Sequence, residues 1–310
     1  MSIVKSKWLA LVAAAAMAAV SVTAHAEKEM KPFILGSAGS GDVASKAADV
    51  KAALENNGFE IAGEYSPYEG AQIIVVTNEE LKKAAASHNR GGYVAPQRVS
   101  ITKVGDEVQV AYTNPEYMAA AYHIKKGNMA KVKSDLAAAL GSVKEYGPDE
   151  GMSADDLEDY HYTFGMEYFD EPYELASYRS QKDAVEAVAK GLAQGAGGTT
   201  MVYRIDIPGT NQTVFGVGMS DDKTGNKYMD EKFIMSEIDF KPVRSTAHLP
   251  YEILVTDGNV EALHARFRIA INFPDLSMMG ANSFMNIMPT PDAINEALTQ
   301  AAGGEVESDI

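Results

Sequence analysis

The feature that most constrains the fold of this chain is a pattern that occurs twice. In the first copy, residues 96–140, a proline opens a strand, a hairpin at Gly105-Asp106 leads to a second strand, and a helical stretch ends at Leu140. The second copy starts at Pro250 and ends with a helical stretch near residues 294–301. Farther upstream, residues 32–37 recur in type as residues 172–177, at an offset of 140. The sequence therefore predicts a tandem duplication.

Each copy is predicted to have the element order β-α-β-β-α-β-β-α. In the first copy, Asp42 should cap a helix over residues 43–56, where apolar side chains recur at helical spacing. The segment Ala38–Asp42 is rich in glycine but lacks the spacing of a phosphate-binding loop, so we expect a flexible turn there. The predicted fold class is α+β, with two duplicated α/β-sandwich domains whose mainly antiparallel sheets carry helices on one face.

The second copy is longer than the first in two places. The loop Asp221–Asn226 is expected to hold much of an insertion of about 12 residues, because the offset between copies grows to 154 by Pro250. Pro274 is matched with Pro115 at an offset of 159, so the second hairpin is expected to be longer by five residues. A strand is predicted over Leu263–Ile271, where apolar and polar residues alternate.

The first residues have the composition of a secretory signal peptide. Lys5 and Lys7 precede an apolar run over residues 8–22, and Ala24-His25-Ala26 supplies the small residues of a cleavage site. The run is shorter than the roughly 20 residues that span a bilayer, which argues against the alternative of a membrane anchor. We therefore expect export to a bacterial periplasm, cleavage after Ala26, and no membrane span in the mature protein.

Five segments follow from these patterns. They are the signal peptide at 1–26, a first repeat domain at 27–141, an aromatic and acidic linker at 142–171, a second repeat domain at 172–303 and a disordered tail at 304–310.

Composition limits the range of functions. The chain has a net charge of −16 and no cysteine. Such a charge repels phosphate backbones and anionic lipid surfaces, so nucleic-acid binding and docking on anionic membranes are disfavoured. Without disulfides, the folded state must be stabilised by packing.

Two groups of residues are candidates for ligand binding. On the strand predicted over 263–271, the basic side chains would lie on one face and could bind an anionic ligand or an acidic partner; they are His264, Arg266 and Arg268. The alternative is a solvated sheet face with local ion pairs, for example to Asp206 or Glu252. The linker adds the aromatic candidates His161, Tyr162 and Phe164.

Four methionines within eleven residues form a candidate metal site. They are Met278, Met279, Met285 and Met288. Thioether sulfur suits Cu(I), and His161 and Met166 of the linker could add ligands. Methionine also packs irregular cores and lines apolar pockets, so core packing and an apolar-ligand pocket remain alternatives.

Other chemistry has less support in the sequence. No His-x-His or His-x-x-x-His spacing suggests zinc, and the motif Gly-x-Ser-x-Gly is absent. No cofactor is predicted. Whether the protein is an enzyme stays open, because carboxylates from distant segments could meet in the fold. The sequence favours a non-catalytic role with an unidentified small ligand or protein partner.

Four short motifs stand out in the first copy. They are a helix that ends in Gly58-Phe59, a strand that ends in residues 75–78, the entry to the next strand at Ala95-Pro96, and Asn114-Pro115. In these motifs the first copy resembles the domain of unknown function 302 family. The second copy is similar only more loosely, since Gly197-Gly198 replaces the Gly-Phe pair. The resemblance implies a fold and no established chemistry.

Overall fold

A computed structural model describes residues 28–163 and 165–306; the predicted signal peptide and the last four residues of the predicted tail lie outside them. The first half, residues 28–146, contains in order β1 (Phe33–Ser40), α1 (Val43–Asn56), β2 (Glu60–Tyr65), β3 (Ala71–Thr77), α2 (Glu79–Ala85), β4 (Gln97–Val104), β5 (Glu107–Thr113), α3 (Pro115–Ala121), α4 (Met129–Leu140) and β6 (Lys144–Tyr146).

A short helix, α5 (Ala154–Glu158), lies in the connection to the second half, residues 173–306. That half contains in order β7 (Tyr173–Ser177), α6 (Gln181–Gln194), β8 (Thr199–Ile207), β9 (Gln212–Met219), α7 (Glu231–Ile238), β10 (Tyr251–Thr256), β11 (Asn259–Ala262), α8 (Ala265–Asn272) and α9 (Thr290–Ala302).

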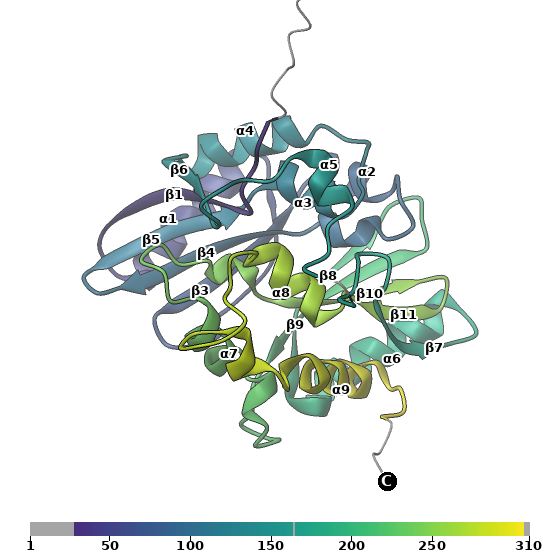
Figure 1. The fold of residues 1–310 in the computed structure, drawn as a ribbon. Coiled ribbons are helices and arrows are strands. Elements are labelled where there is room, and N and C mark those ends of the chain that lie inside the picture. The colour runs from purple at the N-terminus through teal and green to yellow at the C-terminus, as the bar shows by residue number, and fades with distance from the viewer. Residues whose placement is uncertain (1–27, 164, 307–310) are drawn as a thin grey trace, which may run out of the picture.

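The described strands form two antiparallel sheets, which confirms the α+β class (Figure 1). The first has the order β2-β3-β4-β5-β1-β6 and the second β8-β9-β10-β11-β7. Apart from β6, the two orders correspond strand for strand. Both sheets also have a register shift at the same place, between Ile61 and Gly63 in β2 and between Met201 and Tyr203 in β8. The halves thus share an architecture, whereas the duplication of the sequence stays a prediction.

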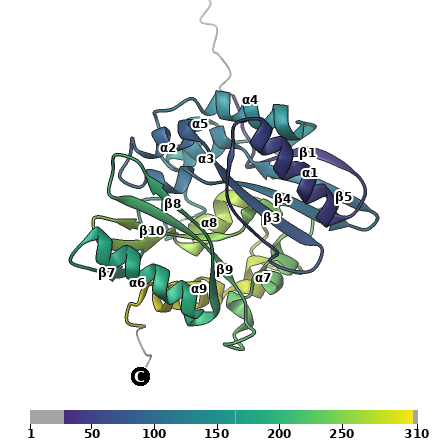
Figure 2. The same cartoon turned by 180° about the vertical axis from the view of Figure 1, so that it is seen from behind.

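Each sheet has a helix-covered face and a face directed at the other half. Along β4, Val99 and Ile101 belong to the apolar core that includes α1 and α4, whereas Arg98 contacts the second half. Along β10, Ile253 belongs to the core beside α6 and α9, whereas Glu252 contacts the first half. Alternation along a strand places neighbouring residues on opposite faces, so helices α1 and α4 and helices α6 and α9 lie on the outer sides (Figures 1 and 2).

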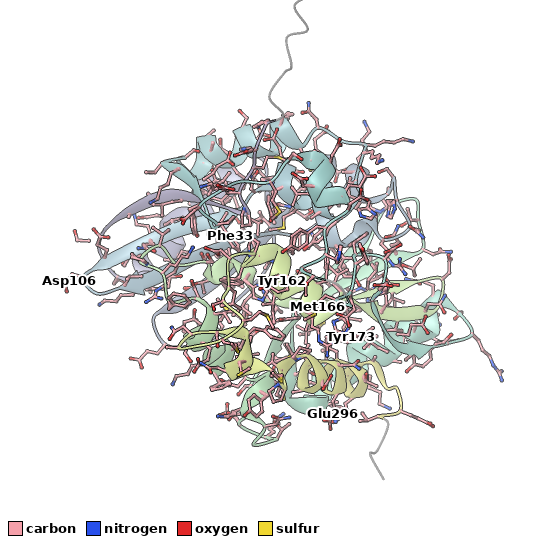
Figure 3. All side chains as sticks on the ribbon, viewed as in Figure 1. Phe33, Asp106, Tyr162, Met166, Tyr173 and Glu296 are labelled. Carbon is pink, nitrogen blue, oxygen red and sulfur yellow. The ribbon has the colours of Figure 1, made fainter. Side chains whose placement is uncertain are left out.

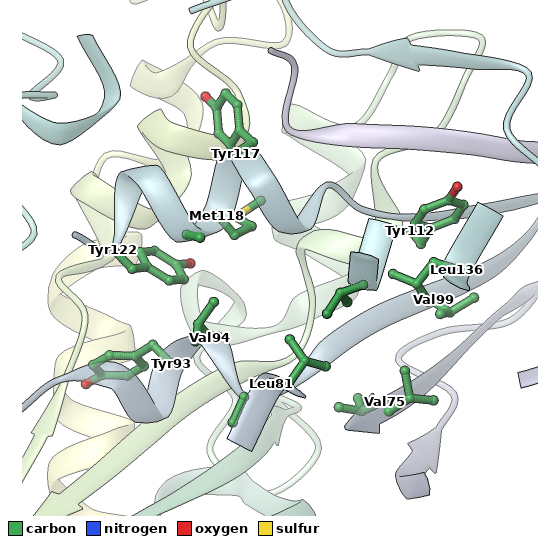
Figure 4. Packing of buried hydrophobic residues seen from close by; sticks show 14 of the residues in the cluster. Val75, Leu81, Tyr93, Val94, Val99, Tyr112, Tyr117, Met118, Tyr122 and Leu136 are labelled. Atoms are coloured by element: carbon green, nitrogen blue, oxygen red, sulfur yellow. The ribbon is translucent and has the colours of Figure 1, made fainter. Parts of the chain in front are cut away.

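The helix starts follow local signals in the sequence. As predicted, Asp42 caps α1, because its Oδ1 atom accepts a hydrogen bond of 2.9 Å from the backbone N–H of Ser45. Asn78 caps α2 through the N–H of Leu81, also at 2.9 Å. Leu81 then packs into the core with Val94, as Figure 4 shows.

A buried ion network joins the inner faces of the two sheets. Nη1 of Arg98 lies 2.6 Å from Oε1 of Glu252, and Nη2 of Arg268 lies 3.1 Å from Oε2 of the same carboxylate. All three side chains are at most 2% exposed. Arg268 also lies over the ring of Tyr251, with 4.2 Å from its guanidinium carbon to the ring centre. Burial and the two guanidinium groups hold the pKa of the nearby His248 well below its usual value, so this imidazole is neutral.

The edge strands of the two sheets meet at their register shifts. A Cβ atom added to Gly63 of β2 would lie only 2.1 Å from the carbonyl oxygen of Val202 in β8. Only glycine allows this approach. Beyond it, the hydroxyl of Tyr65 donates to Oε1 of Glu231 at 3.0 Å, which connects the end of β2 with α7.

Four expectations for local structure were wrong. The residues expected as a strand over 263–271 form a short connection after β11 and then α8. Pro274 therefore follows a helix, whereas Pro115, with which it was matched, begins one. The second hairpin is therefore not longer, since β11 has four residues and β5 has seven. Much of the glycine-rich segment continues β1 as far as Ser40, which pairs with Glu107. The helical stretch ending at Leu140 is divided into α3 and α4.

The replacement Glu252→Gln tests the buried network. Removing one charge leaves two buried guanidinium groups without their counterion, so we expect the free energy of unfolding to fall by about 3–5 kcal/mol in urea titrations. The control is Glu64→Gln, which removes the exposed ion pair between Lys51 and Glu64 and should cost less than about 1 kcal/mol. Equal, small losses in both variants would contradict the importance of the network.

The carboxyl group of Glu231 should make stability depend on pH. Burial raises its pKa to about 8, although Tyr65 donates a hydrogen bond to it, so ionisation is costlier in the folded state than in the unfolded state. The contribution of Glu231 to the free energy of unfolding should be fully present below the ordinary pKa of a glutamate carboxyl. It should be lost as the pH rises through the folded-state pKa of about 8. We expect a decrease on the order of a few kcal/mol between pH 5 and 8.5.

The variant Glu231→Gln isolates this contribution. It cannot ionise, so its free energy of unfolding, measured in urea at each pH, should fall less steeply than that of the wild type over the same range. Asp239, whose pKa burial raises to about 6, contributes to both proteins and cancels in the comparison. Parallel curves for the two proteins would show that Glu231 is not the titrating group.

Candidate functional site

An apolar groove lies where the linker, α8 and the methionine segment meet. The methionine segment is defined here as residues 275–288, between α8 and α9. The groove is lined by Tyr162, Met166, Arg266, Ile269, Ala270, Phe273, Leu276, Met278 and Phe284. Figure 3 shows Tyr162 and Met166 beside α8, with Tyr173 farther toward α9. Two of the predicted ligand-binding residues, Tyr162 and Arg266, therefore share one site with Met278 of the predicted metal site. Met166, expected as an additional metal ligand, lines the same groove.

The groove is nearly closed by flexible side chains. Its cavity volume is only about 20 Å³, which is room for about one water. Met166 and Met278 have unbranched side chains with three rotatable bonds and can take other rotamers at low cost. A ligand larger than water therefore needs these methionines to move.

A carboxylate of the linker ties the linker to α8. Oε1 of Glu167 accepts a hydrogen bond of 2.8 Å from Nη1 of Arg266 and lies 3.2 Å from Nε2 of His264. Its other oxygen, Oε2, is buried and has no hydrogen-bond partner among the described residues. Arg266 is thus the cation that lines the groove, and it forms an ion pair with the carboxylate of Glu167.

His264 is the N-cap residue of α8, and its ring also lies beside Glu167. Its Nδ1 atom accepts a hydrogen bond of 3.2 Å from the backbone N–H of Arg266, and its ring centre lies 4.1 Å from that of Tyr173. Burial is the main cause that lowers the pKa of His264 to about 4, against the opposing effect of Glu167. The imidazole is therefore neutral at pH 7, and its contact with Glu167 is not an ion pair.

The four methionines predicted as a metal site are exposed. The exposed fraction of their side chains ranges from 38% for Met278 to 69% for Met279. The segment turns back on itself, because the N–H of Met285 donates to the carbonyl of Met278 at 3.2 Å. Ile287 is buried and attaches the segment to the second core. Core packing, one of the alternatives from the sequence, therefore does not account for these side chains.

The remaining predicted residues lie elsewhere. Arg268 points away from the groove into the buried ion network, so the three basic residues do not share one strand face. The ring of His161 stacks on Tyr168 within the linker, with 4.4 Å between ring centres. Phe164 lies outside the described residues. Farther along the linker, Phe169 is buried between Tyr122 of the first half and Phe267 of α8.

Histidine and acidic side chains do not form a metal site in the described part of the chain. No three His, Asp or Glu side chains there are grouped as metal ligands. Burial raises the pKa of both Glu231 and Asp239, but the two residues lie at opposite ends of α7, eight positions apart. This separation corresponds to about 12 Å along a helix, too far for a carboxylate pair that shares a proton.

Several groove residues could not be identified from the sequence. Glu167 was one acid among many in the linker, and nothing in its spacing indicated that Arg266 would be its partner. Leu276 and Phe284 flank the methionines but carried no separate signal. Ile269 was placed on a strand face, whereas the helix directs it toward the groove.

These features describe an α+β protein with two sheets of corresponding strand order and an apolar groove beside the second sheet. Residues 38–143, which cover most of the first half, match the family model described as Domain of unknown function DUF302. The predicted resemblance of the first copy to this family is thereby confirmed, and the match ends before the second copy. Comparison with curated proteins and with solved structures found no match. None of the helices in the described residues combines the length and apolar character needed to cross a membrane.

Proposed function

We propose that this protein is an exported, periplasmic binding protein for an apolar small molecule, which it holds in the groove between the linker, α8 and the methionine segment. The observation that carries the proposal is the groove itself, where aromatic and aliphatic side chains from three segments converge. Ligand pockets typically combine such an apolar lining with a few polar groups that orient the ligand. The exposed methionines suit this role, because soft, flexible side chains can adapt to ligands of irregular shape.

The polar group at the groove is Arg266. Its guanidinium group pairs with Glu167, and a ligand with an acidic group could replace that carboxylate. The ligand class that fits best is therefore an apolar molecule with one anionic group. Displacement of Glu167 would release the linker from α8 and widen the groove.

Two further proposals concern the origin of the protein. The basic residues, apolar run and small residues before position 27 support export and cleavage after Ala26. The corresponding strand orders and the register shifts 140 residues apart support the descent of both halves from one duplicated domain. In this proposal only the second half acquired the groove, because the methionine segment has no counterpart between α3 and α4.

The groove predicts binding of the anionic apolar dye 1-anilinonaphthalene-8-sulfonate to the mature protein, residues 27–310. The dye should bind saturably at one site, detected by its fluorescence. Met278→Gln should weaken that binding about three- to tenfold, because it replaces apolar surface of the groove with a polar amide.

The matched control is Met201→Gln on β8. Met201 is 43% exposed, close to the 38% of Met278, but it does not line the groove. Its replacement should leave dye affinity within a factor of two. Equal weakening in both variants, or fluorescence that rises without saturation, would contradict a specific groove.

The exposure of the methionines favours a second candidate, a soft-metal site for Cu(I). It predicts that Cu(I), titrated under reducing conditions against a competing chelator, binds more tightly than about millimolar. A variant with all four methionines of the segment changed to leucine should lose that binding but keep an apolar surface. No binding by the wild type, or equal binding by the variant, would exclude this candidate.

A further inference from the structure

Three cationic residues line a cleft that is separate from the groove. Lys103 extends from β4 of the first half, Lys232 from α7, and Arg244 from the connection between α7 and β10. The cleft measures about 390 Å³, and it shares no lining residue with the groove. Its walls come from both halves, so it exists only when the two sheets are assembled.

The charge of the cleft is opposite to that of the chain. Besides the three cations, the only ionisable acid that lines it is Asp239, so its described lining carries a net charge of +2 even when Asp239 is ionised. The whole chain carries −16. None of the three cations has an acidic side chain within ion-pair distance among the described residues, although other cations of the chain do, such as Lys133 with Glu116 and Glu145. Cations gathered in one cleft repel each other unless an anion lies between them.

The carboxylate of Asp239 does not neutralise the three cations of the cleft, because both of its oxygens accept hydrogen bonds from the loop that follows it. Oδ1 accepts the N–H of Ser245 at 2.7 Å, and Oδ2 accepts the hydroxyl of Thr246 at 3.2 Å. The hydroxyl oxygen of Thr246 in turn accepts from Thr102 at 2.9 Å and from Tyr68 at 3.4 Å. These bonds connect the two halves and direct the carboxylate into the loop.

The same loop orients Arg244. Its backbone N–H donates to Oε1 of Gln109 at 2.9 Å, and its Nη1 donates to the main-chain carbonyl of Asp239. Nε and Nη2 donate no hydrogen bond to another described residue. A guanidinium group that is held on one side and free on the other presents donors suited to the paired oxygens of a carboxylate or phosphate.

We infer that this cleft between α7 and the first sheet binds an oxyanion, the phosphate or carboxylate group of a small molecule, through Lys103, Lys232 and Arg244. Its volume admits a molecule of several non-hydrogen atoms. The site is independent of the proposed apolar groove, so either can fail without the other.

Isothermal titration of the mature protein with inorganic phosphate, and separately with citrate, tests the inference. At least one of these anions should bind saturably, and the double variant Lys103→Gln/Lys232→Gln should weaken its binding at least tenfold. A preference for phosphate would assign the site to phosphoryl groups, and a preference for citrate would assign it to carboxylates. Arg244→Lys keeps the charge but loses the forked donor, so it should weaken binding less than the double variant does.

The matched control is Lys126→Gln/Lys190→Gln, which removes the same charge at two exposed lysines away from the cleft. It should change the affinity less than twofold. Thermal unfolding of each variant checks that the fold is retained. The inference is wrong if neither anion binds saturably, or if the control weakens binding as much as the cleft variant, which would indicate only the general effect of charge.

Discussion

The structure depends on a single buried carboxylate, that of Glu252. It lies between the guanidinium groups of Arg98, from the first sheet, and Arg268, from α8, with all three side chains essentially inaccessible to water. Charges in such a place are costly unless each is paired, so the sheets and α8 can associate in only a few ways that keep the network complete. This constraint sets the position of α8, and therefore of the groove that α8 lines on its other side.

The sequence was informative wherever structure is set locally. Asp42 predicted a helix start because a side-chain cap acts within three residues, and Asn78 caps α2 in the same way. The sequence did not predict α8. This helix is buried on nearly all sides, so its sequence has no apolar stripe at a period of 3.6 residues. Its apolar and basic residues alternate as in a strand, and only the long-range pairing of Arg268 with Glu252 reveals why a basic residue lies inside.

The candidate site was predictable only in part, because some of its residues are grouped in the sequence and others are brought together by the fold. The methionines and linker aromatics stood out as clusters of one residue type. Four residues named from the sequence line the groove: Tyr162, Met166, Arg266 and Met278. The partnership of Glu167 with Arg266 spans 99 positions and depends on how the linker crosses α8. The cationic cleft has the same character, since its three cations come from separate segments and meet only when both sheets are in place. No spacing in the sequence encodes either arrangement.

The measurement that tests the central proposal most directly is native mass spectrometry of the protein purified from the cells that produce it, with elemental analysis of the same sample. The proposal predicts a chain of residues 27–310 that carries one organic ligand, which is lost on denaturation and is absent or depleted in the Met278→Gln variant. A chain of bare mass would contradict the apolar-ligand role. Bound copper in place of an organic ligand would contradict it too, and would assign the methionine segment to metal binding.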